Sequence, residues 1–251
     1  IVLSPTSLHC INAMDIDLSE GVENAEKVKS AFIQALVEQA RDASPTSAER
    51  SIVDRCVMSL VRGYIASHDA GKNPARLTLV DFYNELKQQP EPEAKGLALD
   101  LEIFITGSLN IFAHESNVDT KKRLMCFDIH EIQPSVSGLA LLVILDFCTQ
   151  RTTINRQLGR FTSIFVDEVQ ELFKHEAGAE YLEYAWRHVR KMGGLMTAAT
   201  QNASTITRHP IGSVMLNNSE YTVMLNQAEP DIEELVRILQ LSDQQAAHLR
   251  S

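Results

Sequence analysis

The sequence has 251 residues, 44% of them hydrophobic, and a formal net charge of −10 at pH 7. This composition allows one sizeable core, or a core with a smaller satellite, and the negative charge argues against the domain as a whole being a general phosphate-backbone binder, which needs Lys and Arg. Four cysteines without C-x-x-C spacing indicate a reducing compartment, and no apolar run approaches the roughly 20 residues that span a bilayer, so we expect a soluble chain.

The first third of the chain predicts helices. After the strand-like residues 1–3, apolar residues recur at helical spacing, for example at Val28, Phe32 and Leu36. Asp81 caps, or lies within, a short helix from Leu79 to Lys87.

Breaks rich in Pro and Gly separate these helices at residues 42–47, 70–75 and 88–93. We therefore expect three parts, which are the start of an α/β core at residues 1–19, a helical subdomain at 20–105, and the rest of the core at 106–251.

The last part of the chain alternates apolar runs with helical patterns. The runs have the length of buried strands covered on both faces, and they lie at residues 123–129, 161–167, 194–200 and 220–226. Helical patterns from Ser137 to Gln150 and from Ala179 to Lys191 separate them, and Ser242 is a candidate cap of a final helix. Strand, helix, strand predicts a parallel sheet with right-handed crossovers.

Polar residues stand at the ends of these predicted strands. Ligands bind beyond the carboxyl ends of strands in a parallel sheet. We expect that rim to gather Asp128, Asp167, Glu168, Gln201 and Asn226.

The pair Asp167 and Glu168 follows the apolar run Ile164 to Val166. An apolar strand that ends in Asp-Glu matches the Walker B pattern, in which the Asp holds hydrated Mg²⁺ and the Glu activates the attacking water. The alternative is an Asp helix cap followed by an acid that favours the first turn of the helix. The short pattern leaves both interpretations open.

Gln201 ends the next predicted strand. A Gln at a neighbouring strand tip can sense the γ-phosphate or the attacking water. The alternative is a polar strand end that caps the following helix through Asn202 or Ser204.

Basic residues gather where the predicted helix before Gly193 ends, at Arg187, Arg190 and Lys191. Cations at a helix C-terminus are favoured by the macrodipole, which is a purely structural role. The functional alternative is an arginine finger that reaches the nucleotide of a neighbouring subunit.

Other chemistry has less support. No histidine shows metal-ligand spacing such as H-E-x-x-H, which argues against zinc. The basic stretch from Arg151 to Arg160 lacks interleaved aromatic residues, which favours a solvated connection over a nucleic-acid grip.

Seven segments, taken in order, resemble the C-terminal ATPase domain of type IV secretion and conjugative transfer ATPases, the VirB-four and TraC class. The resemblance extends over almost the whole chain, with Ala13 standing where the family commonly has Pro. The segments are INAMDID (11–17), GSLNIF.H..NVD (107–119), RLMCFDI (123–129), IFVDEVQELF (164–173), WRHVRKMGG (186–194), TAATQN (197–202) and NNSEYTVMLNQ (217–227).

The resemblance implies a RecA-like P-loop core with a helical insertion, using ATP and Mg²⁺. Asp167 matches the Mg²⁺-binding acid, Glu168 the catalytic carboxylate and Gln201 the strand-end glutamine. Arg190 matches the finger, with Arg187 as the second choice.

The phosphate loop G-x-x-x-x-G-K-[ST] does not occur in the sequence. The resemblance places it before Ile1, and because the sequence also starts without Met, we expect a longer parent chain. Without that loop, these residues alone should bind nucleotide poorly and be inactive as an ATPase.

The predicted function is Mg²⁺-dependent ATP hydrolysis that powers pilus assembly or substrate translocation. The resemblance implies a homo-oligomer, a hexamer or smaller, that works with other secretion components at the cytoplasmic face of the bacterial inner membrane. Two alternatives stay open, a DNA-translocating motor of the coupling-protein type, against which the net charge weighs, and a noncatalytic docking module.

Overall fold

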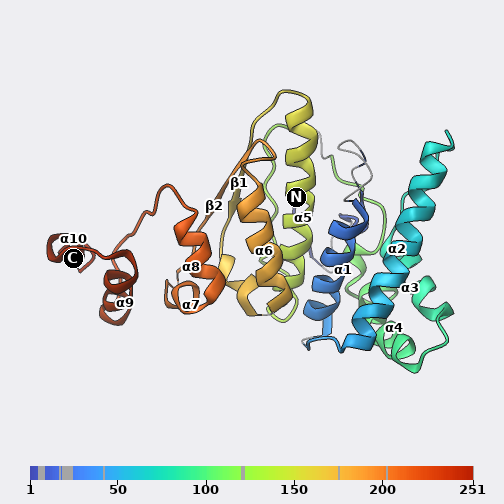
Figure 1. Cartoon of the computed structure of the whole chain (residues 1–251), viewed down its shortest axis with the longest axis horizontal. Helices are drawn as coiled ribbons and strands as arrows, with labels where there is room; N and C mark the ends of the chain where they lie inside the picture. Colours follow the sequence, from blue (N-terminus) through green and yellow to red (C-terminus); the bar gives the residue numbers. More distant parts are fainter. Residues whose placement is uncertain are drawn as a thin grey trace.

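The computed structural model describes residues 1–4, 9–16, 18, 25–41, 43–119, 122–174, 176–201 and 203–250. Helices dominate these residues, and two β-strands lie between them (Figure 1). The helices and strands are α1 (Ala25–Arg41), α2 (Ser47–Asp69), α3 (Leu79–Gln88), α4 (Pro92–Ile105), η1 (Asn110–Phe112), α5 (Ser137–Gln157), β1 (Thr162–Val166), η2 (Val169–Lys174), α6 (Glu176–His188), β2 (Gly194–Ala198), α7 (Ala203–Arg208), α8 (Pro210–Asn217), α9 (Glu229–Leu239) and α10 (Asp243–Ala247).

Helices α1 to α4 form the side of the molecule farthest from the C-terminus (Figure 1). Capping boxes start two of them, since Thr46 and Glu49 exchange hydrogen bonds at α2 while Thr78 and Asp81 do so at α3. Asp81 thus lies within the first turn of its helix. One continuous core runs from Leu3 to Met215 and joins these helices to the rest, so the proposed boundary at residue 105 stays a prediction.

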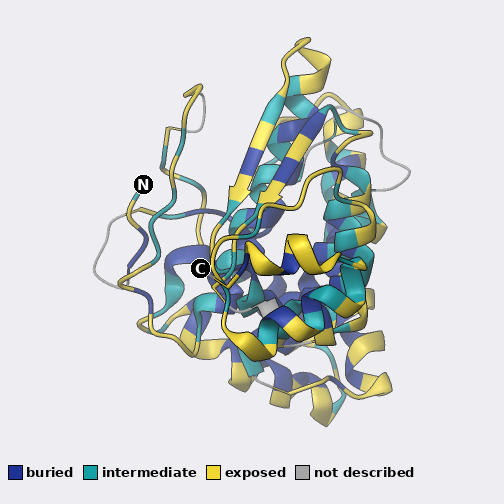
Figure 2. Ribbon diagram, turned by 90° about the vertical axis from the view of Figure 1, so that its left-hand side faces the viewer, coloured by how far each residue is buried: buried dark blue, intermediate teal, exposed yellow. Residues whose placement is uncertain are grey.

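The two strands pair in parallel, with Ile164 opposite Met196 and Val166 opposite Ala198. Helix α6 lies between them in the chain, as expected for a strand, helix, strand unit. Burial alternates along both strands (Figure 2). Ile164 and Met196 face the core, whereas Phe165 on the opposite face is 75% exposed. The sheet is therefore covered on one face, and the predicted cover on both faces is wrong for this structure.

The crossover from α6 to β2 ends at a glycine pair, as predicted. Gly193 has φ +79, a left-handed conformation that glycine adopts without steric cost. A Cβ on Gly194 would come within 2.7 Å of the Thr152 side chain of α5, so glycine also permits this close approach. The helix itself ends at His188, three residues before the predicted Lys191.

Two of the predicted strands are absent from the described residues. In 123–129, Asp128 forms only an isolated parallel bridge with Val2, and Leu124 is 88% exposed. In 220–226, which contains no regular element, Tyr221 and Val223 are exposed. An apolar run becomes a strand when its N–H and C=O groups find a ladder. Residues 126–128 make only a short parallel pairing with residues 1–3, through three backbone hydrogen bonds of 2.8 Å, and 220–226 forms no ladder among the described residues.

A buried ion pair joins three helices of the core. Lys29 Nζ of α1 lies 2.9 Å from Asp146 Oδ2 of α5, and both side chains are 4% exposed. Tyr181 of α6 donates to the other carboxylate oxygen at 2.6 Å. Burial, and after it the neighbouring Asp146 carboxylate, raise the pKa of the Tyr181 hydroxyl well above its usual value, so it stays protonated and donates.

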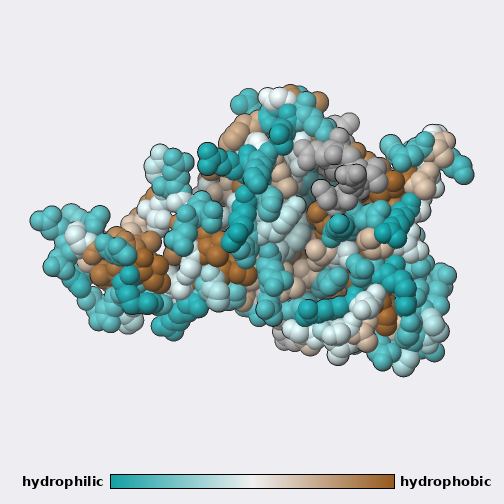
Figure 3. All heavy atoms as spheres, viewed as in Figure 1, coloured by the Kyte–Doolittle hydropathy of each residue, from teal (hydrophilic) through white to brown (hydrophobic). Residues whose placement is uncertain are grey.

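Helices α9 and α10 lie at the C-terminal end of the molecule beside α7 (Figure 1), and Arg208 of α7 pairs with Glu234 of α9 at 3.3 Å. They share a small core of Ile232, Ala246 and Leu249, and Figure 3 shows apolar atoms gathered at this end of the molecule. Ser242 caps α10 by accepting a hydrogen bond from Gln245 N, as predicted.

Candidate active site at the strand ends

The acidic pair lies just beyond β1, where the strand gives way to η2. Asp167 is exposed and Glu168 is partly buried. Asp167 Oδ1 accepts a hydrogen bond of 3.0 Å from the backbone N–H of Glu168. The helix-cap alternative needs Asp167 to accept from a later N–H in a following α-helix, whereas η2 is a 3-10 helix.

Glu168 has an unusual backbone conformation. Its φ is +50, a region that residues other than glycine enter at a cost and that occurs often at functional sites. Hydrogen bonds fix the chain on both sides, because Ala199 N donates to Val166 O at 2.8 Å and Val169 N donates to Ala199 O at 3.2 Å. These bonds hold the turn after β1 against the end of β2.

Two side-chain amides hold the Glu168 carboxylate. Gln201 Nε2, from beyond β2, donates to Oε1 at 2.6 Å, and Gln170 Nε2, from η2, donates to Oε2. Thr200 orients Gln170 by donating to its Oε1 at 2.7 Å. The structure therefore brings the predicted pair of Glu168 and Gln201 together, with each carboxylate oxygen bound by a different amide.

Sequence reasoning missed Gln170 and Thr200. Both positions lie inside segments that the motifs already marked. Thr200 is the last residue of the predicted strand 194–200, but no role was given to its hydroxyl, and Gln170 has no strand-end position. The signal that could have found Gln170 is its spacing, two residues after Glu168 in a tight turn.

The donor set at this edge suits a hydrated Mg²⁺. Asp167 offers an exposed carboxylate, and Mg²⁺ usually binds one or two carboxylates while keeping water and phosphate oxygens as its other ligands. Within the described residues, no group of three or more His, Cys, Asp or Glu side chains could hold a metal. A magnesium ion here would take its remaining ligands from water and nucleotide.

Neither candidate arginine reaches this edge within its own chain. Arg187 pairs with Glu183 at 2.7 Å, and Arg190 is exposed in the turn after α6. Both precede β2, whereas Gln201 follows it, and four residue steps of strand separate the ends by roughly 13 Å. The arginines therefore lie toward the start of the strands, away from Glu168 and Gln201.

The remaining rim residues are not brought to the carboxylate pair by strands. Asp128 contacts His130, whose backbone and side-chain N–H groups lower the pKa of the Asp128 carboxyl. Asn226 lies in the irregular segment before α9, so its predicted place at a strand end is wrong. Asn202, the alternative helix cap, lies outside the described residues.

Comparison with known proteins identifies the family. The sequence matches the TraG P-loop domain over residues 108–251, more than half of the chain. The chain belongs to the TraG P-loop domain family. This membership confirms the relationship to type IV secretion and conjugation ATPases that the motifs predicted. No curated protein matches the chain in sequence.

The fold of this TraG-family chain is similar to that of a solved structure, VirB4 of Thermoanaerobacter pseudethanolicus. The TM-score is 0.80 at 17% sequence identity, and the match covers 100% of this chain and 70% of that one. The likeness confirms the predicted fold class, an α/β P-loop NTPase core with a parallel sheet and many helices. None of the helices in the described ranges is long and apolar enough to span a membrane.

Proposed function

We propose that this TraG-family chain hydrolyses ATP in a Mg²⁺-dependent reaction that powers type IV secretion or conjugative transfer. The observation that carries the proposal is the Glu168 carboxylate, which two amides hold beside Asp167 at the carboxyl ends of β1 and β2. A general base must be held within hydrogen-bond reach of its water, and this arrangement supplies such a fixed carboxylate.

Each residue has a separate role in the proposal. Asp167 holds the hydrated Mg²⁺, which neutralises charge that develops on the phosphates. Glu168 accepts a proton from the water that attacks in line, and Gln201 and Gln170 keep its two oxygens in position. Gln201 also links the base to the end of β2, so a shift of either strand end changes the position of the base.

The proposal requires groups beyond these residues. A phosphate-binding loop must come from sequence outside residues 1–251, since the motif does not occur within them. Arg190, or in second place Arg187, acts on the nucleotide of a neighbouring subunit in a homo-oligomer, a hexamer or smaller. The oligomer works with other secretion components at the cytoplasmic face of the inner membrane.

The test is phosphate release from ATP by the natural full-length protein. Glu168→Gln should lower kcat by roughly 10² to 10⁴ while nucleotide still binds, because only proton transfer is lost. Asp167→Asn should raise the Mg²⁺ concentration that half-maximal turnover needs, since a carboxylate ligand becomes a neutral amide.

Glu93→Gln, an exposed position in α4, is the matched control and should behave as wild type. Normal turnover in Glu168→Gln would rule out the proposed base. Strong stimulation of turnover by DNA, sensitive to salt, would indicate a DNA-translocating motor.

A further inference from the structure

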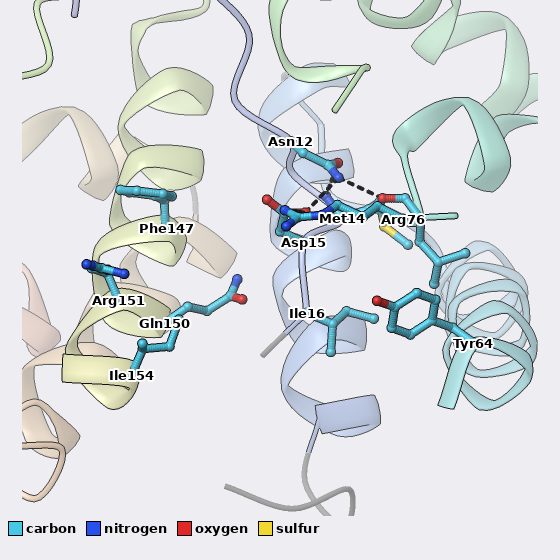
Figure 4. A pocket seen from close by; sticks show the side chains of 11 residues that line it. Asn12, Met14, Asp15, Ile16, Tyr64, Arg76, Phe147, Gln150, Arg151 and Ile154 are labelled. Atoms are coloured by element: carbon cyan, nitrogen blue, oxygen red, sulfur yellow. Dashed lines mark hydrogen bonds and ion pairs between the residues drawn. The ribbon is translucent and has the colours of Figure 1, made fainter. Parts of the chain in front are cut away.

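A cavity of about 310 Å³ lies on the far side of α5 from the sheet. The segment 12–16 lies across from α5, and Tyr64 of α2 and Arg76 complete the wall (Figure 4). Small-molecule sites are typically about 300 to 1,000 Å³, so the cavity has room for a compact ligand.

The cavity is separate from the strand-end site. Its α5 residues are spaced three or four apart and form one face of the helix, namely Phe147, Gln150, Arg151 and Ile154. A different face of α5 meets the strands, where Asn155 donates to Thr162 Oγ1 at 2.9 Å. Neither Asp167 nor Glu168 is among the described residues that line the cavity.

Among the described residues, the polar lining holds one positive charge that has no partner. The Asp15 carboxylate already accepts from Asn12 Nδ2 at 2.9 Å and Ser116 Oγ at 3.2 Å, and it pairs with Arg76 at 3.5 Å. Arg151 is partly buried and makes no hydrogen bond or ion pair with any described residue. In a chain of net charge −10, this guanidinium makes the cavity a local site of attraction for an anion.

The wall beside Arg151 is held in place. Gln150 Nε2 donates to Asp146 Oδ2 at 2.6 Å, and the same oxygen binds Lys29 of the buried ion pair. A side chain fixed before binding loses little conformational entropy when a ligand arrives. The opposite wall is tied too, because Asn12 Nδ2 also donates to Leu77 O at 2.7 Å.

Apolar side chains that are only partly buried make up much of the rest of the lining, including Ile16, Phe147 and Ile154. A bare inorganic anion would leave this apolar surface in contact with water. We propose that the cavity binds a compact organic anion, with a phosphate or carboxylate group on Arg151 and an apolar body against these side chains. The site is independent of ATP hydrolysis at the strand ends.

Calorimetric titration of the natural full-length protein with three probes tests the proposal. Phenyl phosphate and benzoate combine a ring with each acidic group, and phenol has the ring alone. At least one anion should bind in the millimolar range or tighter with one site per chain, and phenol should bind at least about tenfold more weakly. The tighter anion identifies whether the natural ligand carries phosphate or carboxylate.

Variants locate the binding. Arg151→Gln should lower the affinity for the anion about tenfold or more. Arg76→Gln should lower it less, because Arg76 already pairs with Asp15. Arg160→Gln changes an exposed arginine of the same stretch and is the matched control. Glu168→Gln should bind the probe as wild type does, which separates this site from the proposed ATPase. Failure of both anions to bind, equal binding of phenol, or full affinity in Arg151→Gln would each overturn the proposal.

Discussion

Gln201 Nε2 lies 2.6 Å from Glu168 Oε1, although 33 residues separate them in the sequence. The contact exists because β1 and β2 are parallel neighbours, which brings their carboxyl ends to one edge. Gln170 binds the second oxygen from within the same turn. Residues from two strand ends thus determine where this carboxylate points.

Gln170 should position Glu168 without touching the substrate. In Gln170→Ala, one carboxylate oxygen loses its donor, and we expect kcat to fall roughly tenfold to a hundredfold with little change in KM, because orientation and not binding is lost. Steady-state ATPase kinetics of the full-length protein measure this. Gln133→Ala, on an exposed loop, is the control, and an equal rise in KM would argue against a positioning role.

Arg190 should act across a subunit boundary. Arg190→Ala and Glu168→Gln proteins should each be nearly inactive, yet their mixture should recover activity, since some interfaces then combine an intact base with an intact arginine. Turnover of mixtures in varied ratios tests this. Mixing wild type with the double variant is the control. A fully active Arg190→Ala protein would move the role to Arg187.

The buried pair of Lys29 and Asp146 should be costly to break. Lys29→Met leaves a carboxylate without its cation inside the core, and we expect the free energy of unfolding to fall by about 3 to 5 kcal/mol. Urea unfolding measures the change. Arg62→Met removes an exposed pair with Glu26 and should cost less than about 1 kcal/mol. Similar losses in the two variants would contradict the burial argument.

Glu49 should make stability depend on pH. Burial alone would raise the pKa of its carboxyl, but hydrogen bonds from Thr46 and Arg41 outweigh burial and lower it. Because the folded pKa lies below the unfolded value of about 4.3, the stabilisation is complete above that pH and is lost as pH falls through the folded pKa.

Glu49→Gln keeps a side chain able to form the capping box but removes the charge. Near pH 7 we expect the free energy of unfolding of this variant to be about 1 kcal/mol lower than that of wild type. The difference should shrink as the pH falls below about 4. Thermal unfolding across this range tests the prediction, and a difference that stays constant at low pH would exclude the Glu49 charge as its cause.

The sequence predicted which segments can form strands better than it predicted which strands pair with one another. The strands after Phe161 and Gly193 were found because each apolar run leads to a polar end beside a helical pattern. The run at 220–226 has the same character, but Tyr221 and Val223 stay exposed, since pairing depends on a neighbouring strand that a local pattern cannot specify.

Only part of the site could be predicted from the sequence, and the reason is again that local patterns do not specify contacts. Strand-end positions pointed to Glu168 and Gln201, whereas the contribution of Gln170 depends on side-chain directions within a 3-10 turn. The ion pair of Lys29 and Asp146 could not be predicted from the sequence either, because 117 residues separate the two and a lysine in an amphipathic helix normally faces water.

The buried pair also limits how the molecule can move. Sliding α1 along α5 would part an ammonium from a carboxylate away from water, at several kcal/mol for each ion. Tyr181 fastens α6 to the same carboxylate. We therefore expect the three helices to move as one rigid body, and a motion driven by the proposed ATP hydrolysis would pivot outside it, for instance at residues 218–228, which contain no regular element.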